Sequence, residues 1–421
     1  MELRYLQIYR LISNFATSLV GAFIPLILFE YTGNIIYSVL YIVLQRLMSA
    51  ILNKLFEKAV FKKPQVFLMF RVIPIIIFEV LTIFVDKSPI LISGLIGVAY
   101  AFDYACNILP SEMVFNYNST DDSAKTLGIT RTIEQIGFVL AMVLGSLFLD
   151  NLPVYYLIIM SISLYIISII PLTIFYVKNK QRSTYNKEFV SSAIESNTHD
   201  KAEKQKIIKS VKKKYFIQYL FIQGTDVFYL LLPFVVYLSY GKFVQAAIMT
   251  AVYDTVLCVV GVLIGKLDEK KDLTKLNSIC CFLSGILIVL FMILLPYTEL
   301  FYLECVLVFI ISVTTAFPYI FVYNRMLSKA RVLGTSSQSI SNMLLACALS
   351  DVVVQSFGFF FPMAVPMYLG AGLLVAEAVV CPILEESSRK DMVDFIGDNE
   401  TATNLPQDVE IVDISNYKDK L

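Results

Sequence analysis

Histidine and charged residues are scarce in this sequence. Its 421 residues include one histidine, His199, and only 16% of them are charged. A soluble globular domain carries about 25% charged residues, so the composition argues against a soluble protein. Because the one histidine lies in a polar stretch, neither a histidine metal cluster nor a histidine proton relay within a membrane is available.

Motifs for enzymatic chemistry are also missing. The seven cysteines all fall in apolar runs and show neither C-x-x-C spacing nor a disulfide framework. The sequence has no phosphate-binding P-loop, no nucleophile elbow and no cluster of metal ligands. We therefore expect no ATP-driven step, no enzymatic activity, no bound metal and no cofactor.

Apolar runs fill most of the chain, which is 57% hydrophobic and has a mean hydropathy of +0.71. A helix needs about 20 apolar residues to cross the hydrocarbon core of a membrane. The sequence predicts an all-α polytopic membrane protein with two groups of six transmembrane helices. The expected spans lie near residues 5–29, 35–52, 65–85, 89–109, 127–149, 152–176, 215–239, 243–265, 276–295, 298–323, 338–361 and 363–384.

Two polar segments divide this pattern into domains. Residues 178–214 hold eleven Lys or Arg against four acids, whereas 385–421 holds ten acids against four bases. Neither segment has the interleaved aromatics of a nucleic-acid surface, so we expect no nucleic-acid partner. The predicted domains are a six-helix bundle at 1–176, a partly disordered basic linker at 177–214, a second bundle at 215–384 and a disordered acidic tail at 385–421.

Lysine and arginine also predict the orientation, because cytoplasmic loops carry an excess of these residues. The connections after the second, fourth, eighth and tenth spans, and the central segment, are the basic ones. We therefore expect the protein to lie in the cytoplasmic membrane, with both termini in the cytoplasm. The loop cations are Lys54, Lys58, Lys62, Lys63, Lys125, Lys270, Lys271, Lys275, Lys329 and Arg331.

The chain repeats itself at half its length. "PSEMVFNYNSTDDSAKTLG" begins at Pro110 and "PYIFVYNRMLSKARVLG" at Pro318, 208 positions later. "FIPLILFEYTG" ends at Gly33 and "LLPFVVYLSYG" at Gly241, again 208 positions later. These matches predict a duplicated six-helix unit. An even number of helices keeps the same membrane orientation, so the halves are related by an axis along the membrane normal, and a cavity between them favours alternating access by rocking.

At this point the chain resembles the major facilitator superfamily over residues 5–384. "GKLDEKKD" at 265–272 is similar to the family's loop signature, with Gly265, Asp268 and Lys270 in the matching places. The corresponding first-half loop keeps an acid and a base, Glu57 and Lys58. With the inner-face cations Lys125 and Arg331, these residues form the candidate gate motif. The resemblance implies a monomeric secondary transporter with a small-molecule substrate.

Within the superfamily, "TSLVGAFIPLILFEYTGN" at 17–34 resembles the first helix of macrolide-efflux-like drug exporters. This favours proton-coupled export of an amphipathic compound. The fifth predicted helix, however, lacks the Gly-Pro pair usual in proton-driven exporters, which counts against the usual antiport mechanism. Uptake or facilitated diffusion of a polar nutrient is one alternative, and a transport-dead receptor or scaffold is another.

Ionisable residues within the predicted spans are costly and therefore face protein or water. The candidates for proton or cation coupling are Arg46, Asp103, Glu134, Asp226, Asp254 and Asp351. Arg46 and Asp351 come out at depths that differ by roughly 6 Å, and the family fold places their helices side by side. They are a predicted pair across the gate. Glu134 and Asp254 also come out at comparable depth on adjacent helices, and they are candidates to carry a proton. The alternative for each is a structural contact between helices.

Polar and aromatic residues near the middle of the lining helices are candidates for the substrate cavity. An aromatic lining would favour export and a polar one uptake. Helix packing is the commoner use of the amides in this group. The cavity candidates are Asn14, Tyr100, Tyr104, Gln223, Phe228, Tyr229 and Gln355.

Overall fold

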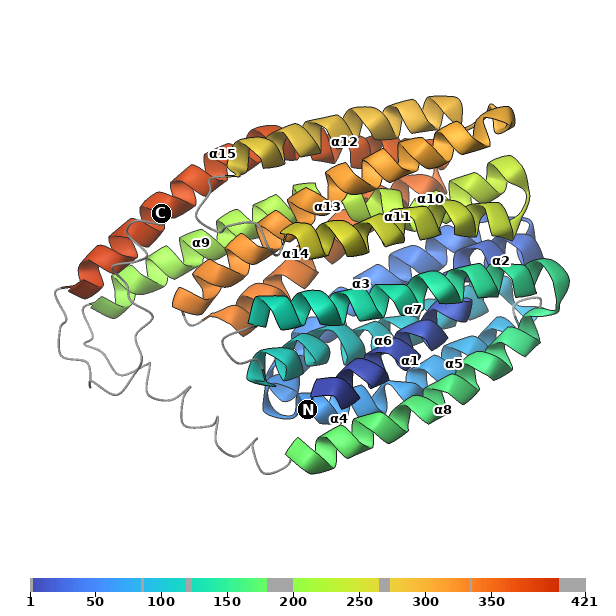
Figure 1. Ribbon diagram of the computed structural model, residues 1–421, viewed down its shortest axis with the longest axis horizontal. Coiled ribbons are helices and arrows are strands. Elements are labelled where there is room, and N and C mark those ends of the chain that lie inside the picture. Colours follow the sequence, from blue (N-terminus) through green and yellow to red (C-terminus); the bar gives the residue numbers. More distant parts are fainter. Residues whose placement is uncertain are drawn as a thin grey trace.

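The protein is all-α in the part of the chain that its computed structural model describes, residues 3–84, 87–118, 123–179, 200–264, 273–333 and 335–400 (Figure 1). Two short 3₁₀ helices, Thr298–Leu300 and Phe357–Phe359, join longer elements. The α helices are α1 Leu3–Gly21, α2 Ile24–Thr32, α3 Ile35–Lys62, α4 Pro64–Phe70, α5 Val72–Thr82, α6 Pro89–Asn118, α7 Ser123–Asn151, α8 Val154–Asn179, α9 Asp200–Ile222, α10 Gly224–Tyr240, α11 Phe243–Ile264, α12 Thr274–Leu294, α13 Phe301–Val332, α14 Ser336–Ser356 and α15 Ala364–Glu400.

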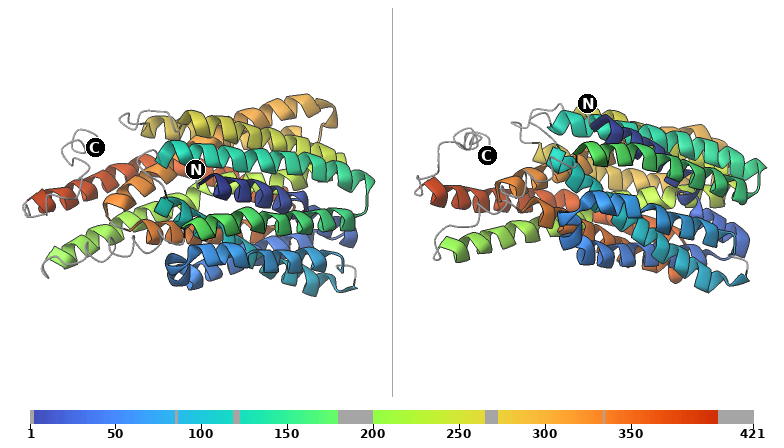
Figure 2. Two further views of the ribbon diagram at one scale, coloured as in Figure 1. Left: turned by 60° about the horizontal axis from the view of Figure 1, so that its bottom comes forward. Right: turned by 90° about the horizontal axis from the view of Figure 1, so that it is seen from below.

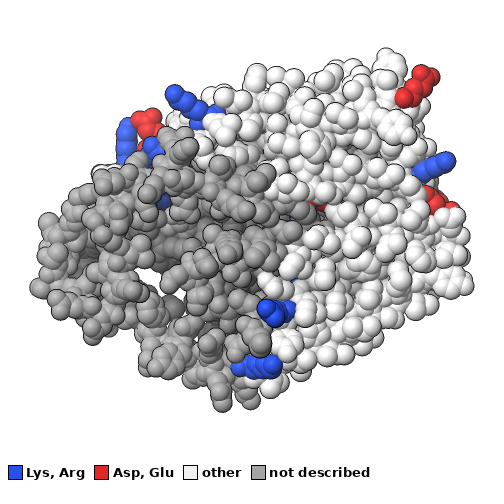
Figure 3. Space-filling view, viewed as in Figure 1, with Lys and Arg blue, Asp and Glu red and all other residues white. Residues whose placement is uncertain are grey.

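Twelve spans result when helices that follow each other directly are joined, as α1 with α2, α4 with α5, and α9 with α10. Nine stretches of the described chain are long and apolar enough to cross a membrane, and shorter apolar helices lie in α7 and α11. The pair α4–α5, bent at Arg71, is the remaining span. On the face in Figure 3 the described surface is mostly white, and most of the coloured charges lie along its edges. The predicted fold class is confirmed.

The helices form two halves, α1–α8 and α9–α15, which lie one above the other in Figure 1 and are turned to two further views in Figure 2. The seam between the halves is made by α3 against α14 and by α7 against α11. The end of the bundle with the turns at 33–34, 152–153, 241–242 and 360–363 is called the short-loop end. The opposite end, with residues 3, 179, 200 and 400, is the long-loop end.

The duplication is visible in two turns at the short-loop end. Gly33 ends α2 with a φ of 64°, and Gly241 ends α10 with a φ of 72°. Each donates its N–H to the carbonyl four residues earlier, at Phe29 or Tyr237. They are the only residues with positive φ in the described chain. A left-handed cap suits glycine because glycine has no Cβ to clash. The repeated glycines therefore have the same structural role.

The halves are closed against each other at the short-loop end. Phe29 of α2 packs edge-on against Phe234 of α10, with ring centroids 5.6 Å apart. Phe23 contacts Phe243 in the same way at 6.0 Å. The Asp150 carboxylate at the end of α7 accepts the backbone N–H groups of Phe243 and Val244, which satisfies the first donors of α11 in the other half.

The fourth and tenth predicted spans lie within longer helices. Helices α6 and α13 continue past Pro110 and Pro318 to Asn118 and Val332, whereas the predicted spans ended at 109 and 323. A proline inside a helix removes one hydrogen bond and bends the axis. Here it does so without ending the helix, because the neighbouring helices hold both segments.

The predicted linker and tail also need correction. Residues 200–214 belong to α9 and residues 385–400 belong to α15, so both extend spans as helix rather than as disordered chain. The reason is mutual packing. Val211 and Tyr215 of α9 are buried, and α9 lies along α15. Burial of this apolar face outweighs the charge that suggested disorder. Residues 180–199 and 401–421 lie outside the described chain.

Candidate transport site

Arg46 and Asp351 form an ion pair across the seam, as predicted. Arg46 projects from α3 in the first half and Asp351 from α14 in the second, with Nε 3.1 Å from Oδ2 and side chains only 11% and 0% exposed. The Arg46 Nε has no aligned hydrogen-bond acceptor, so the contact is electrostatic. The guanidinium also lies over the ring of Tyr104 on α6, 5.6 Å from its centre. Arg46 therefore contacts both halves: it pairs with a carboxylate of the second half and lies over an aromatic ring of the first.

A bend in the seventh span brings a second carboxylate to this pair. Helix α9 ends at Ile222, α10 begins at Gly224, and Gln223 lies between them. The Gln223 Nε2 donates to Asp226 Oδ2 at 2.6 Å and to Asp351 Oδ2 at 3.1 Å. One amide thus joins two carboxylates, and the polar chain runs from Arg46 through Asp351 and Gln223 to Asp226.

Glycines allow the bend to lie directly on α15. A Cβ added at Gly224 would lie 2.2 Å from the carbonyl oxygen of Gly370 and 2.9 Å from Leu374 Cγ. The two backbones therefore touch where any side chain would separate them. This contact fixes the position of Gln223 relative to the second half.

The chain from Arg46 to Asp226 is not fully satisfied. Asp351 Oδ1 and Gln223 Oε1 are buried without a hydrogen-bond partner in the described structure. Arg46 supplies one positive charge against the two carboxylates of Asp226 and Asp351. Ionised, the group carries an uncompensated negative charge in a low-dielectric interior, which favours binding of a proton or another cation.

Asp254 lies on α11 among aromatic rings. It is 1% exposed, and its carboxylate accepts one long hydrogen bond, from the Tyr229 hydroxyl at 3.4 Å. The Tyr229 ring lies 5.5 Å from that of Tyr253 on α11 and 6.2 Å from that of Phe138 on α7. The side chain of Glu134, predicted at comparable depth, is outside the described part of the structure, so their proximity stays a prediction.

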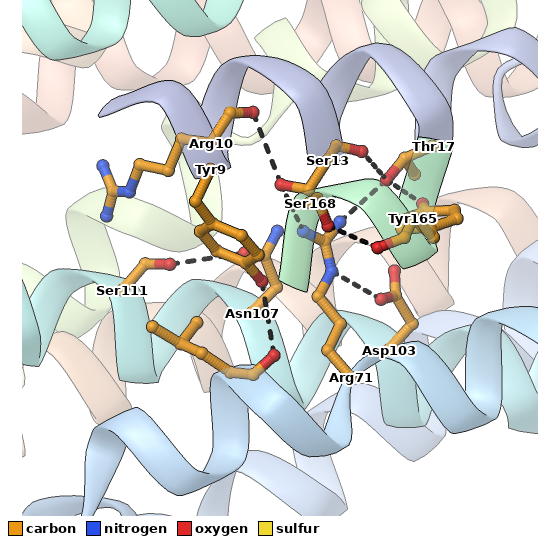
Figure 4. Close-up of polar contacts among 11 residues, drawn as sticks. Tyr9, Arg10, Ser13, Thr17, Arg71, Asp103, Asn107, Ser111, Tyr165 and Ser168 are labelled. Carbon is orange, nitrogen blue, oxygen red and sulfur yellow. Dashed lines mark hydrogen bonds and ion pairs between the residues drawn. The ribbon is translucent and has the colours of Figure 1, made fainter. Parts of the chain in front are cut away.

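A second buried ion pair lies wholly inside the first half (Figure 4). Arg71, at the bend between α4 and α5, places Nε 2.7 Å from Asp103 Oδ1. Its Nη1 donates to Ser13 at 3.1 Å and its Nη2 to Thr17 at 2.7 Å, both on α1. Thr17 in turn contacts the Tyr165 hydroxyl of α8. Figure 4 shows the guanidinium between α1 and Asp103.

The Arg71 pair was missed by the sequence analysis. Its signal was available, because a single arginine interrupts the apolar run 65–85 and a charge there needs a partner. The consequence concerns Asp103, a coupling candidate: its charge is matched by Arg71 at a site that is 2% exposed. This geometry is that of a structural contact between α1, α5, α6 and α8.

The remaining cavity candidates divide into partly exposed and buried residues. Tyr100 stacks on Tyr41 with centroids 6.1 Å apart and is partly exposed, as are Asn14 and Tyr104. Phe228 is a correction: it is 1% exposed and packs against Phe291 and Tyr253 in the core of the second half. Its neighbour Tyr229 takes the seam-facing position, and helical geometry turns adjacent residues about 100° apart. Gln355 is buried, with Nε2 unpartnered in the described structure.

The candidate gate motif falls outside what the structure describes. Four of its residues lie in helices, but their side chains are not described: Glu57, Lys58, Lys125 and Arg331. The other three lie between described segments: Gly265, Asp268 and Lys270.

A further polar cluster joins α9, α13 and α15 near the long-loop end. Lys329 Nζ lies 2.8 Å from Glu385 Oε2 and donates to Ser388 at 3.1 Å. The Tyr215 hydroxyl donates to the other Glu385 oxygen at 3.0 Å. The sequence analysis used Lys329 only for orientation and placed Glu385 in a disordered tail. The cluster explains why α15 stays folded there.

Two repeated six-helix halves that span a membrane and meet at a seam are an arrangement typical of secondary transporters. The chain matches the family described as Major Facilitator Superfamily over residues 8–349. It therefore belongs to the major facilitator superfamily, and it is a multi-pass membrane transporter of a small molecule rather than an enzyme.

Solved structures share this fold. One is a bacterial homologue of the iron transporter ferroportin in an outward-facing state, with a TM-score of 0.64 and 11% sequence identity. The likeness covers 93% of this chain and 100% of that one. At this identity it shows the fold alone. No curated protein matches the sequence.

Proposed function

We propose that the protein exports a small amphipathic compound in exchange for protons, acting as a monomer by alternating access. The observation that carries the proposal is the polar chain Arg46–Asp351–Gln223–Asp226, which crosses the seam between the halves. A rocking motion of the halves changes this chain directly, because Arg46 belongs to one half and the three other groups to the other.

Proton coupling follows from what happens when the pair separates. Removing one partner from a buried ion pair costs about 3–5 kcal/mol, because the other charge is left unpaired. If Arg46 moves away with its half, Asp351 is such a charge, and binding a proton removes the penalty. Asp226 shares the Gln223 amide, so a proton on either aspartate leaves Arg46 facing one charge.

The described conformation fits one state of an export cycle. Lysine and arginine favour the long-loop end as the cytoplasmic side, with both termini there. The short-loop end, closed by Phe29 and Phe234, then faces outward from the cytoplasmic membrane. Export requires a state that is closed to the outside while the substrate binds from the cytoplasm or the inner leaflet.

Aromatic residues near the seam favour an amphipathic solute over a polar nutrient. Tyr104 lies under Arg46, and Tyr229 faces Phe138 of the other half. Rings of this kind offer apolar faces with a polar tip, which suits a compound that has both kinds of surface.

Transport by purified protein in liposomes with an imposed pH gradient tests the proposal. We expect gradient-driven flux of at least one amphipathic compound in a solute panel. Asp351→Asn should lose it by at least tenfold while keeping exchange of labelled for unlabelled compound. Glu377→Gln is the matched control, because it also neutralises a buried carboxyl, on α15 where this helix packs against α12. This variant should keep both the gradient-driven flux and the exchange. Flux that ignores the gradient in the native protein would reject proton coupling.

A further inference from the structure

The charges near the seam do not balance. Among the side chains that the structure describes, Arg46 is the cation paired with this group of Asp226, Asp254 and Asp351, and it pairs with Asp351. In the part of the chain that the structure describes, no Lys or Arg side chain forms an ion pair with Asp254. Its one hydrogen bond, from Tyr229, is at the long limit for such a contact. A carboxylate that is 1% exposed and so weakly bonded favours a cationic ligand.

The tyrosine that contacts this carboxylate lies in a row of aromatic rings drawn from both halves. Phe138 belongs to α7, Tyr229 to α10 and Tyr253 to α11, with centroids 5.5 and 6.2 Å apart along the row. A cation within about 6 Å of a ring face is attracted by the ring quadrupole, and more strongly where water is excluded. A carboxylate with tyrosine and phenylalanine faces suits an organic cation better than a hydrated metal ion, which prefers oxygen ligands.

An apolar groove opens beside this position toward the lipid. It has a volume of about 360 Å³ and lies between α7, α11 and α13, lined by Val143, Ile248, Ala251, Val252, Thr255, Val256 and Phe309. Its outer rim is well exposed, with Phe309 at 50%. Ala251 and Thr255 lie three residues before and one residue after Asp254 on the same helix, and Asp254 itself does not line the groove. The groove therefore follows the lipid side of the α7–α11 seam, and the carboxylate lies on the inner side.

The geometry points to a binding site for lipophilic organic cations at Asp254, with the charged group of the ligand against the carboxylate and its apolar body along the α7–α11 seam, entered from the bilayer through the groove. When no ligand is bound, the Tyr229 hydroxyl donates a hydrogen bond to the Asp254 carboxylate, and a bound cation takes the place of this hydroxyl. This assignment names the substrate class of the transporter and thus rests on the proposed function.

Binding to purified protein in detergent tests the site without any gradient. The probes are tetraphenylphosphonium, which is permanently charged, and triphenylphosphine oxide, a neutral molecule of similar shape, each measured by equilibrium dialysis against empty micelles. We expect saturable binding of the cation and at least tenfold weaker binding of the neutral probe. Asp254→Asn should weaken binding of the cation at least about tenfold, and Glu377→Gln should leave it within twofold.

Two further variants test the rings and the groove. Tyr229→Leu removes a ring face and should weaken cation binding about 2- to 30-fold. Val252→Trp fills the groove and should also weaken it, whereas Ile279→Trp on the lipid face of α12, where Ile279 is 61% exposed, should not. If Asp254→Asn does not fold, Tyr229→Leu and the charged-against-neutral comparison in the native protein decide.

Four results would overturn the assignment in whole or in part. Unchanged affinity in Asp254→Asn, or equal binding of the neutral probe, rejects the cation site. Unchanged affinity in Val252→Trp rejects the lateral route and leaves the groove to lipid acyl chains. Proton-driven flux of another solute without phosphonium binding rejects this inference alone. Saturable phosphonium binding that depends on Asp254, without gradient-driven flux, rejects the proposed coupling alone.

Discussion

Arg46 and Asp351 belong to different six-helix halves, yet their side chains meet 3.1 Å apart with almost no exposure. A buried ion pair adds little net stability, because desolvation offsets the attraction. It does make the two halves depend on each other, since each partner leaves an unpaired charge behind when it departs. The pair is therefore better suited to reporting the position of the halves than to holding them together.

Removing only one member of this pair should destabilise the protein strongly. We expect Arg46→Met to lower the free energy of unfolding by about 3–5 kcal/mol, because Asp351 stays buried and unpaired. Arg46→Met with Asp351→Leu should recover most of the loss. Unfolding in mixed micelles measures both. Lys390→Met is the control, since its pair with Glu386 is over 70% exposed on both sides and such pairs contribute little. A loss in that control equal to that of Arg46→Met would contradict the argument.

The guanidinium of Arg71 should not be replaceable by an ammonium. Arg71 contacts Asp103, Ser13 and Thr17 through three different nitrogens, and lysine has one. We expect Arg71→Lys to cost about 1–3 kcal/mol of unfolding free energy through the polar groups left unpaired. Arg4→Lys, at an exposed position of α1, should be neutral. A fully stable Arg71→Lys variant would show that the fork geometry is unimportant.

The contact between Gly224 and Gly370 should tolerate no side chain. Gly224→Ala places a Cβ 2.2 Å from the Gly370 carbonyl oxygen, and overpacking of this kind costs about 1–3 kcal/mol. Gly372→Ala is a close control, because nothing lies within 4 Å of its added Cβ. Melting temperature in detergent should fall for the first variant only. Similar melting of the two variants would place α10 and α15 further apart than described.

The two left-handed glycines should respond alike to substitution. An added Cβ meets nothing within 4 Å at Gly33 or Gly241, so alanine introduces backbone strain alone, roughly 1–2 kcal/mol at each site. Asparagine should be milder at both, because it tolerates this conformation better. Gly94→Ala on α6, where the Cβ would make an ordinary 3.5 Å contact with Leu44, is the control. A large loss at only one of the two sites would argue against equivalent turns.

The sequence was sufficient for the spans and the repeat, because both depend on patterns along the chain. Hydropathy marks where helices cross the membrane, and the spacing of Gly33 and Gly241 fixes which turns correspond. Helix ends were less accessible: whether a helix stops at Pro110 or continues depends on the neighbours that hold it. The extension of α15 depended on Glu385 meeting Lys329, 56 positions away.

The site could be predicted only where depth was informative. Arg46 and Asp351 lie on helices that meet at the seam, so similar depth implied contact. Depth gave no means of choosing a partner for Asp103, because Arg71 reaches it from a bend inside the same half. The place of Phe228 depended on the rotation of α10, which packing against Phe291 decides.

The length of α15 gives this protein a visible landmark. Its 37 residues extend about 55 Å at about 1.5 Å per residue, whereas a bilayer's hydrocarbon core is about 30 Å thick. With α9 beside it, α15 projects past the other helices in Figure 2. Images of single particles in detergent or nanodiscs should therefore show a rod outside the disc on one side only. That rod would distinguish the two membrane faces and guide particle alignment without an antibody fragment.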